Sequence, residues 1–549
     1  MTAEWWRHAV IYQIYPKSFA DASGDGVGDL HGVVARLDHL ARLGVDAIWL
    51  SPFYRGPQRD GGYDVADHRD VDPRFGTVAD AERLVEEAHR RGIRVIVDVV
   101  PNHTSSDHPF FREAMASPPG SPAWGRYHCV RGRGPDGDEP PNDWRSLFGG
   151  IAWTRIPDAD GAPTGWWYLH LFDAHQPDVD WSHPDVVAEF DATLRYWFDR
   201  GVDGFRIDVA HGLVKAPGYP DAGRPGTAPV ASATPYFDQP GVHAIYRRWR
   251  EIADAYDPPR IFVAEAWLDA PEKRAAYLRP DELHTGFNFE LLVADWDADA
   301  WRRVVDASLA ADATVGAPTT WVTENHDVRR APTRYGGRVV HREVPTESHL
   351  ARGRRRSLGA TCAMLALPGT TYLYQGQELG LDEVIDLPDA AREDPHFHRT
   401  AGAALGRDGC RVPLPWRRSG LGLGFSGARE VAPWLPQPAR WAALSVEAQE
   451  GDPDSTLERT RRAIAVRRAT PALLEGGFVW EPGVGGDGSG VLAWRRTHAA
   501  GDVVCVLNMG EAPVRLPEGR LLAASHDPVA TRDDRALPQD AAAWVAPAR

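Results

Sequence analysis

The sequence predicts an α/β protein built on a closed (β/α)₈ TIM barrel, with a small domain inserted after the third strand and an antiparallel β domain at the carboxyl end. Eight short runs of β-branched and aromatic residues recur along the first 378 residues, and several are almost continuously apolar. Stretches of helical periodicity separate these runs, which is typical of buried parallel strands. No Gly-rich phosphate turn follows the first run, which disfavours an open, doubly wound sheet.

Each predicted barrel strand is one of these eight runs. In order they are Ala9–Pro16, Asp46–Pro52, Ile93–Val100, Gly204–Ala210, Arg260–Trp267, His284–Glu290, Thr319–Asp327 and Thr370–Glu378. Two of the intervening stretches, 30–44 and 77–92, have helical periodicity and end in Gly, as helix C-termini often do. The last barrel helix is expected over Ser455–Arg468.

Two connections are too long to be simple strand-to-helix loops. The stretch after strand three is rich in Gly, Pro and Trp, and beyond Pro471 short alternating runs indicate antiparallel strands. The predicted domains are the first part of the barrel (1–100), an inserted domain (101–181), the second part of the barrel (182–470, with an insertion at about 377–441 after strand eight) and a carboxyl-terminal β-sandwich (471–549).

Composition excludes several classes of function. The chain has 61 Lys and Arg against 77 Asp and Glu, a net charge of −16, which argues against a nucleic-acid partner. Its four cysteines form no CxxC pattern, so a zinc site or a disulfide framework is disfavoured. We find neither a signal peptide nor an apolar run of 18 residues, so the expected location is the cytoplasm, away from the membrane. The 21 Trp suit a site that covers sugars.

Three acids stand at the ends of predicted strands, where barrel enzymes place their catalytic residues. Asp208 ends GFRIDVA, Glu265 ends IFVAEAW and Asp327 ends TTWVTENHD. Arg206 shares a strand face with Asp208, so we expect it to lower the pKa of Asp208 and keep this carboxylate ionised. The apolar neighbours of Glu265 should raise its pKa and keep it protonated. One ionised and one protonated carboxyl group are what glycoside hydrolysis requires, although isolated acids can also cap helices or close ion pairs.

Five motifs in the chain resemble those of the α-amylase superfamily (glycoside hydrolase family 13), and within it the branch of α-glucosidases and oligo-1,6-glucosidases. The resemblance extends over essentially the whole chain from about Trp5. The motifs occur in family order: DVVPNH at 98–103, QPDVDW at 176–181, GFRIDV at 204–209, AEAW at 264–267 and ENHD at 324–327.

The resemblance implies a role for each acid. Asp208 would be the nucleophile that forms a covalent β-glucosyl-enzyme, Glu265 the general acid and then the general base, and Asp327 the residue that holds the 2- and 3-hydroxyls. Residues implied to bind the same glucosyl unit are Tyr63, His103, Phe172, Arg206 and His326. A histidine in a buried strand is also often only a core residue.

The resemblance also suggests exo action. In the exo-acting members an acid before the GYD sequence and an arginine after strand eight hold the O4 end of the terminal glucose. Asp60 in RDGGYD and Arg411 in GRDGCRVPLPW match this pair, although Arg411 could instead be a surface cation. If the match holds, the pocket is closed and takes single glucosyl units from chain ends.

The segment DASGDGVGDL has the pattern of a cation-binding loop. Acidic and hydroxyl side chains alternate with glycines, and the resemblance adds a main-chain oxygen as a ligand. The expected ligands are Asp21, Ser23, Asp25, the main chain of Val27, and Asp29. They would hold a structural Ca²⁺ or Mg²⁺, and no cofactor is expected for catalysis. Ser23 replaces the family's Asn or Asp, and an Asp- and Gly-rich turn without an ion is the alternative.

The function expected from this resemblance is a retaining exo-α-glucosidase that releases α-glucose from the non-reducing ends of maltose-like oligosaccharides. Val209 after the nucleophile is frequent in α-1,6-preferring members, so an oligo-1,6-glucosidase is the first alternative. We nevertheless favour α-1,4 activity, because Ala210, His211 and Gly212 depart from the usual oligo-1,6-glucosidase sequence. The second alternative is a transglucosylase or isomerase, such as a trehalose or isomaltulose synthase, and the third is a non-catalytic relative, disfavoured because all three acids are present.

Overall fold

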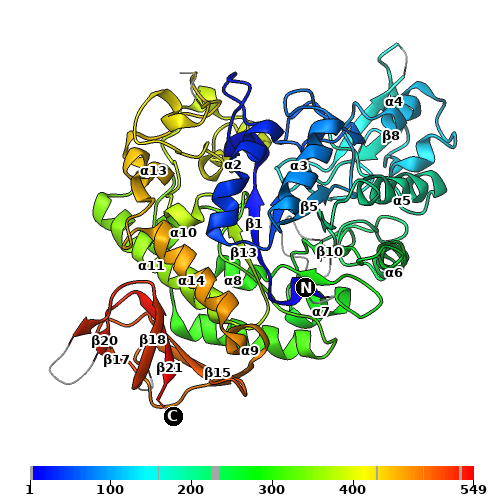
Figure 1. Cartoon of the computed structure of the whole chain (residues 1–549). Helices are drawn as coiled ribbons and strands as arrows, with labels where there is room; N and C mark the ends of the chain where they lie inside the picture. Colours follow the sequence, from blue (N-terminus) through cyan, green and yellow to red (C-terminus); the bar gives the residue numbers. More distant parts are fainter. Residues whose placement is uncertain are drawn as a thin grey trace.

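The computed structural model describes residues 4–158, 160–223, 234–427, 431–485, 488–530 and 535–548. Its centre is a parallel sheet in the order β11-β10-β9-β5-β2-β1-β13-β12 (Figure 1). A parallel bridge between Phe287 and Thr320 joins the two edges, so the sheet closes and the predicted TIM barrel is confirmed. The strands are β1 Val10–Ile14, β2 Ala47–Leu50, β5 Arg94–Val99, β9 Gly204–Ile207, β10 Ile261–Ala264, β11 Thr285–Gly286, β12 Thr320–Val322 and β13 Thr370–Tyr374.

The barrel strands are buried on both faces, which explains why the sequence shows apolar runs and little alternation. In β2, Ala47 and Trp49 pack in the cluster that fills the barrel interior. Ile48 and Leu50 point the other way and pack in the cluster that the surrounding helices share. Alternate side chains of a barrel strand therefore pack in two different cores, one inside the barrel and one between the strands and the surrounding helices.

Helices surround the barrel, and their ends match local sequence signals. Asp29 caps α2 by accepting from the N–H of Gly32, and Gly44 ends it with φ of 89°, a left-handed conformation that suits glycine. None of the helices described here is sufficiently long and apolar to cross a membrane. The longer helices are α2 Leu30–Leu43, α3 Val78–Arg90, α5 Pro184–Phe198, α6 Val242–Asp254, α7 Pro271–Tyr277, α9 Ala298–Ala313, α11 Glu347–Ala366 and α14 Thr456–Ala469; the shorter ones are α1 Pro16–Phe19, α8 Phe289–Val293, α10 Ala331–Tyr335, α13 Val446–Gln449 and α15 Pro471–Glu475.

The observed strands stop earlier than the sequence predicts. Asp208 and Glu265 are each the first residue after their strand, and Asp327 lies five residues beyond the end of β12. The main-chain N–H groups of Asp208 and Glu265 still donate to the neighbouring strands, at Val99 and Ile207. All three acids consequently lie at the carboxyl edge of the barrel, where the sequence places them.

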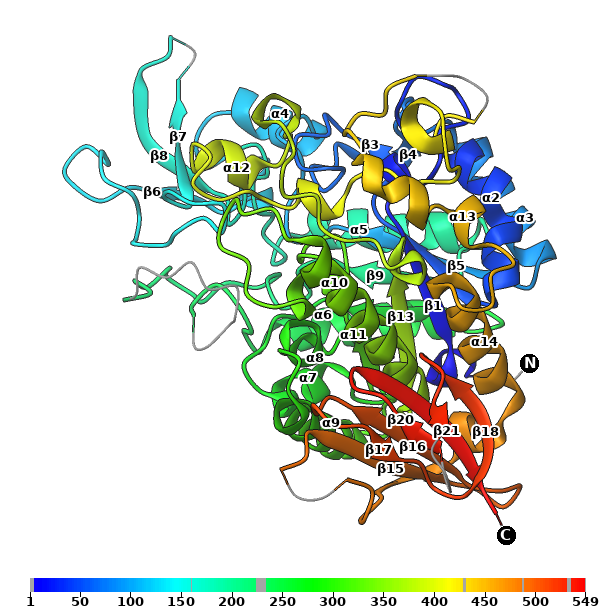
Figure 2. The same ribbon diagram turned by 90° about the vertical axis from the view of Figure 1, so that its left-hand side faces the viewer.

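Two long segments rise from this same edge of the barrel (Figure 2). After β5 the chain forms α4 Pro109–Ala116 and a three-stranded antiparallel sheet in the order β6-β8-β7. After β13 it runs through short helices, among them α12 Pro395–Arg399. A hairpin of β3 Tyr54–Arg55 and β4 Asp67–Val71 lies between β2 and α3. The sheet strands are β6 Cys129–Arg131, β7 Trp153–Pro157 and β8 Pro163–Leu169.

The antiparallel domain at the carboxyl end lies at the opposite end of the barrel (Figures 1 and 2). A five-stranded sheet has the order β14-β15-β16-β21-β18, and a three-stranded sheet has the order β17-β20-β19. In β16, Val504 and Val506 pack with Leu516 and Leu537 between the two sheets. The strands are β14 Gly477–Trp480, β15 Val491–Thr497, β16 Val503–Asn508, β17 Val514–Arg515, β18 Gly519–Ala524, β19 Val529–Ala530, β20 Arg535–Leu537 and β21 Ala541–Pro547.

Candidate active site

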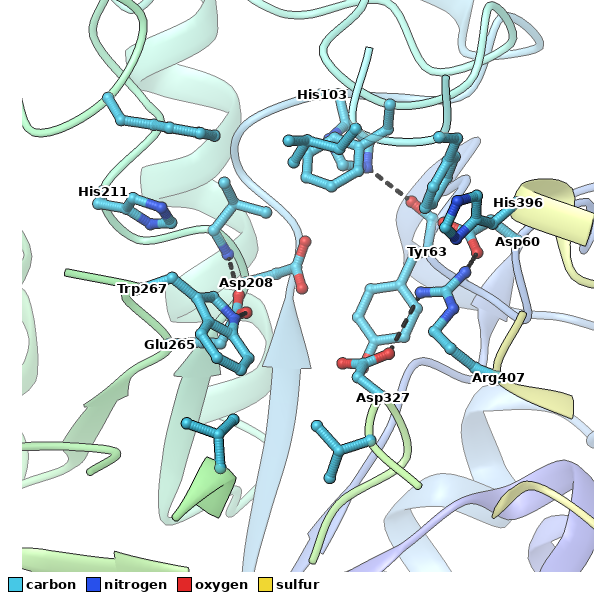
Figure 3. A pocket seen from close by; sticks show the side chains of 17 residues that line it. Asp60, Tyr63, His103, Asp208, His211, Glu265, Trp267, Asp327, His396 and Arg407 are labelled. Atoms are coloured by element: carbon cyan, nitrogen blue, oxygen red, sulfur yellow. Dashed lines mark hydrogen bonds and ion pairs between the residues drawn. The ribbon is translucent and has the colours of Figure 1, made fainter. Parts of the chain in front are cut away.

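A cavity of about 410 Å³ opens at the carboxyl edge of the barrel (Figure 3). Arg206, His326 and Arg411 are buried and contact residues of its lining. Together with the lining they place all ten predicted catalytic and substrate-binding residues at one site. The predicted residues that line the cavity are Asp60, Tyr63, His103, Phe172, Asp208, Glu265 and Asp327.

Asp208 is held against a buried arginine. Its Oδ1 accepts from Nη1 of Arg206 at 2.6 Å, and the same Nη1 donates to Oδ1 of Asp98 at 2.7 Å. Asp98 lies on the adjacent strand β5, and Trp49 and Tyr63 donate to its other oxygen. The carboxylate of Asp98 thus helps to fix Arg206, which in turn holds one oxygen of Asp208.

Glu265 lies beside Asp208, because β10 pairs directly with β9 in the barrel. Its Oε2 accepts from the main-chain N–H of Val209 at 2.6 Å, and its Oε1 accepts from the indole N–H of Trp267 at 2.8 Å. Val209 has φ of 47°, a strained conformation for a β-branched residue, and strain of this kind clusters at functional sites. Nη2 of Arg206 is 3.4 Å from Oε2, so one guanidinium lies against both Asp208 and Glu265.

The charge state of this pair differs from the sequence prediction. Burial raises the pKa of Asp208 well above its usual value despite Arg206, whereas Arg206 was expected to lower it. Burial also raises the pKa of Glu265, as predicted, and the pKa of Asp98 to about 6. The reason is that one guanidinium is shared among three buried carboxyl groups. The three carboxyl groups together tend to retain a proton near neutral pH, and the titration of each depends on the charge of the others.

Asp327 has the opposite environment. Burial would raise its pKa, but His326, Arg407 and Arg411 reverse this and hold it well below the usual value. Its Oδ1 lies 3.0 Å from Arg411 and 3.2 Å from Arg407. His326 is oriented by hydrogen bonds to Tyr63 Oη at 2.7 Å and to Gln13 at 2.6 Å. The carboxylate of Asp327 therefore stays ionised and can accept hydrogen bonds in the cavity.

Asp60 forms its ion pair with Arg407, whereas the sequence analysis assigned Arg411 to this pair. Nη2 of Arg407 lies 2.6 Å from Oδ1 of Asp60, and its Nε lies 2.6 Å from Oδ2 of Asp394. Arg411 instead donates to the main-chain oxygen of His326. Both arginines occur in the sequence GRDGCR, and the short helical turn Asp408–Cys410 between them places Arg407, and not Arg411, in the cavity lining.

His103 is fixed at the junction of the barrel and the inserted segment. Its Nε2 is 3.1 Å from the main-chain oxygen of Tyr63, and its ring lies 5.1 Å from that of Phe172. Gln176 donates to Asp60 at 3.0 Å, so the QPDVDW motif reaches the same corner. Behind His103, the buried Lys215 pairs with Asp178 and donates to Asn102, which bonds to Nδ1 of His103.

The proposed cation loop is held by its own main chain. Asp21 accepts from the N–H groups of Gly24 and Gly26, and Asp29 accepts from those of Ala22, Ser23 and Gly32. Asp25 accepts from Val27. Across the described ranges, no three His, Cys, Asp or Glu side chains come together as a metal site. The expected ligand set is therefore not assembled as a group of carboxylates, and the ion stays a prediction.

Sequence reasoning missed several residues that line the cavity, among them Arg407, Trp267, Phe148 and His396. Arg407 and Trp267 contact the acids directly, and Trp267 was visible in the AEAW motif as an indole two residues from Glu265. Phe148 and His396 come from the two long segments, and their rings lie 6.3 Å apart. No sequence motif identifies Phe148 or His396 as site residues, because they lie far apart in the chain and only folding brings them together.

Comparison with known proteins agrees with this geometry. Residues 13–476 match the family described as alpha amylase, catalytic domain, and residues 483–544 match a domain of unknown function. The chain is 37% identical to a "probable alpha-glucosidase" of Rhizobium meliloti, covering 94% of this chain and 92% of the relative. It is 34% identical to an oligo-1,6-glucosidase of Parageobacillus thermoglucosidasius, with 94% and 93% covered. A crystal structure of an alpha-glucosyl transfer enzyme superposes with a TM-score of 0.84 at 34% identity, covering 98% and 99% of the two chains.

Proposed function

The chain belongs to the alpha-amylase family of glycoside hydrolases, and on this basis we propose that it is a retaining exo-α-glucosidase that removes single glucosyl units from maltose-like oligosaccharides. The observation that carries the proposal is the placement of Asp208 and Glu265 on either side of one guanidinium in a cavity of about 410 Å³. The Asp60–Arg407 ion pair in the lining supports exo action, because these groups can hold the terminal hydroxyls of one sugar.

In the proposed mechanism Asp208 attacks the anomeric carbon as a carboxylate. The bond to the leaving oxygen breaks, and Glu265 gives its proton to that oxygen. In the second half Glu265 takes a proton from water, the water oxygen attacks the same carbon, and the bond to Asp208 breaks. Asp327 accepts hydrogen bonds from the ring hydroxyls throughout, and its lowered pKa supports this role because it stays ionised.

We predict that the α-anomer of glucose appears first. Two displacements at one carbon restore its configuration, and retaining enzymes need the two carboxyl groups about 5 Å apart. The shared contact with Arg206 supports a short separation. Proton NMR of maltose hydrolysis, recorded before mutarotation, measures the anomer. If β-glucose forms first, water attacks directly and the nucleophilic role of Asp208 is wrong.

We predict α-1,4 activity in preference to α-1,6 activity. Val209 lines the site beside Glu265, but a methyl-sized change in a pocket is worth only about 1–3 kcal/mol, which neighbouring loops can offset. The Pro- and Gly-rich sequence of 216–241 predicts a loop that forms much of the leaving-group site, and ten of its residues, 224–233, lie outside the described residues. The measurement is kcat/KM for maltose and isomaltose. An isomaltose preference above about tenfold, roughly 1.4 kcal/mol, would assign the chain to the oligo-1,6-glucosidases.

A transglucosylase is the second candidate, because a solved structure 34% identical to this chain is of an alpha-glucosyl transfer enzyme. It would use the same glucosyl-enzyme and the same Glu265, with a sugar hydroxyl in place of water. NMR of the products formed from sucrose, trehalose and maltose distinguishes the two functions. A hydrolase releases free glucose, whereas a transglucosylase forms rearranged or longer sugars.

We also propose that the loop at Asp21–Asp29 holds a structural cation, with Ca²⁺ or Mg²⁺ as the ion. The alternation of Asp21, Ser23 and Asp25 with glycines in this loop supports the proposal, and none of the three catalytic acids lies in it. We expect EDTA to lower the midpoint of thermal unfolding by a few degrees, with recovery on adding Ca²⁺, and to leave kcat unchanged. An unchanged midpoint would show that the loop folds without an ion.

The proposed location is the cytoplasm. All four cysteines are free thiols in the structure, and Cys362, Cys410 and Cys505 are buried. Free thiols are typical of proteins in reducing compartments. Fractionation of the producing cells, with the activity assayed in each fraction, tests the location.

A further inference from the structure

A second cavity, here called the outer cavity, has a volume of about 510 Å³ and lies outside the barrel between α2 and α13 (Figures 1 and 2). None of its lining residues lines the cavity that holds the three acids. Helix α2 contributes Arg36 and His39 to its wall, and the segment after β13 contributes Trp416 and Arg417. No step of the proposed mechanism uses this cavity.

Two arginines of the outer cavity have no counter-charge. Within the ranges that the structure describes, the guanidinium groups of Arg36 and Arg417 form no ion pair and donate no hydrogen bond. Burial lowers the pKa of Arg36, and the nearby charge of Arg417 lowers it further. The two like charges thus repel each other at this site, and an anion placed beside both would lower the electrostatic free energy.

The acidic side chains of the outer cavity do not neutralise this pair. Asp38 lies 2.7 Å from Arg91, and Glu450 lies 3.4 Å from Arg42. Glu447 accepts a main-chain N–H group at 2.7 Å. Each acid therefore has a partner of its own, and the two guanidinium groups described above stay without one.

Arg36 is held in a way that keeps its N–H groups free. Its Cζ atom lies 4.2 Å from the centre of the Trp416 ring. Trp416 is itself buried, and it packs edge-on against His39 at a centroid distance of 5.2 Å. Stacking occupies the flat face of a guanidinium and leaves the N–H donors at its edge available. Nδ1 of His39 is also buried, with no hydrogen-bond partner among the described residues.

We propose that the outer cavity binds a phosphate group through Arg36 and Arg417. The group is carried by inorganic phosphate or by a phosphate ester of a small metabolite, which present the same oxygens. Planar guanidinium forks match phosphate oxygens and form charge-assisted hydrogen bonds with them. The volume of about 510 Å³ is within the range of small-molecule sites. This binding is separate from glucosyl transfer, and it does not depend on which glucosidic bond the enzyme cleaves.

The first test is isothermal titration calorimetry of the full-length protein with inorganic phosphate at low ionic strength. We expect one saturable site per chain with a Kd of about 1 mM or tighter, because two charge-assisted contacts form in a partly buried site. Chloride at equal ionic strength should give no saturable heat. The absence of saturation at about 20 mM, with inorganic phosphate and with glycerol 3-phosphate alike, would overturn the proposal.

Variants locate the site. Arg36→Gln and Arg417→Gln each remove one guanidinium, and we expect each to weaken phosphate binding at least about tenfold. Arg417→Lys should lose less, because it keeps the charge and lacks only the planar fork. Arg520→Gln is the matched control, since Arg520 is exposed on β18 of the carboxyl-terminal domain, and it should bind phosphate as the parent protein does. Binding that Arg36→Gln and Arg417→Gln leave unchanged would indicate an adventitious ion only and would refute the site.

A second ligand identifies the source of the phosphate group. If the site takes an ester, glycerol 3-phosphate should bind at least about threefold more tightly than inorganic phosphate, and equal affinities would assign the site to free phosphate. Arg417→Gln should keep kcat on maltose within about twofold of the parent protein. The maltose assay therefore tests the proposed α-glucosidase function separately, and a failure of phosphate binding leaves that function unaffected.

Discussion

Replacing Asp208 by Asn is expected to reduce kcat on maltose and on α-glucosyl fluoride more than about a hundredfold, a barrier increase of about 3 kcal/mol. An amide cannot displace the leaving group and form the glucosyl ester, and no other carboxylate can take its place. Asp98 is buried behind Arg206, and Glu265 has to act as the acid. Steady-state kinetics measure the loss, and thermal unfolding checks that the variant is folded.

The matched control for this variant is Asp136→Asn, in an exposed position of the inserted segment. It makes the same change of one atom and one charge, and it should leave kcat within about twofold of the parent. Residual activity above about one per cent in a folded, homogeneous preparation of Asp208→Asn would remove Asp208 from the role of nucleophile.

Replacing Glu265 by Gln should have the second largest effect, and the effect should depend on the leaving group. We expect a loss of about 10²–10⁴-fold on maltose, the range that general acid catalysis contributes. Formation of the glucosyl-enzyme from α-glucosyl fluoride should be much less affected, because fluoride leaves with little need of a proton. Comparing burst rates of the two substrates measures the difference, and an equal loss on both would argue against Glu265 as the acid.

The pH dependence of activity gives a second test of Glu265→Gln. Burial raises the pKa of Glu265, so its proton persists to higher pH than that of an ordinary glutamate. In the parent protein activity should fall on the alkaline side as the pair of Asp208 and Glu265 loses its last proton, and on the acid side as the pair takes up a second proton. Glu265→Gln should abolish the alkaline fall and keep the acid fall. Glu272→Gln, exposed on α7, is the control that should keep both.

Much of the fold and the three acids could be predicted from the sequence because the relevant signals are local. Each barrel strand is buried on both faces, so its sequence is an apolar run. Asp208 and Glu265 directly follow two of these runs. Helix ends were equally local, as Gly44 shows. In 503–508 the sequence is an apolar run and does not alternate as predicted, because β16 packs its side chains in two different cores.

The tertiary structure alone decided three features, and each depends on groups far apart in the chain. Asp60 and Arg407 are 347 residues apart, so only folding selects Arg407 over Arg411 as the partner. The direction of the pKa shift of Asp208 depends on Asp98 and Glu265 as well as on Arg206, because burial and shared charge are properties of the assembled cluster. The lining of the cavity joins Phe148 and His396, which come from the segments after β5 and β13. Pattern and propensity act between near neighbours, whereas electrostatics and the shape of a cavity are set by all the groups that folding brings together.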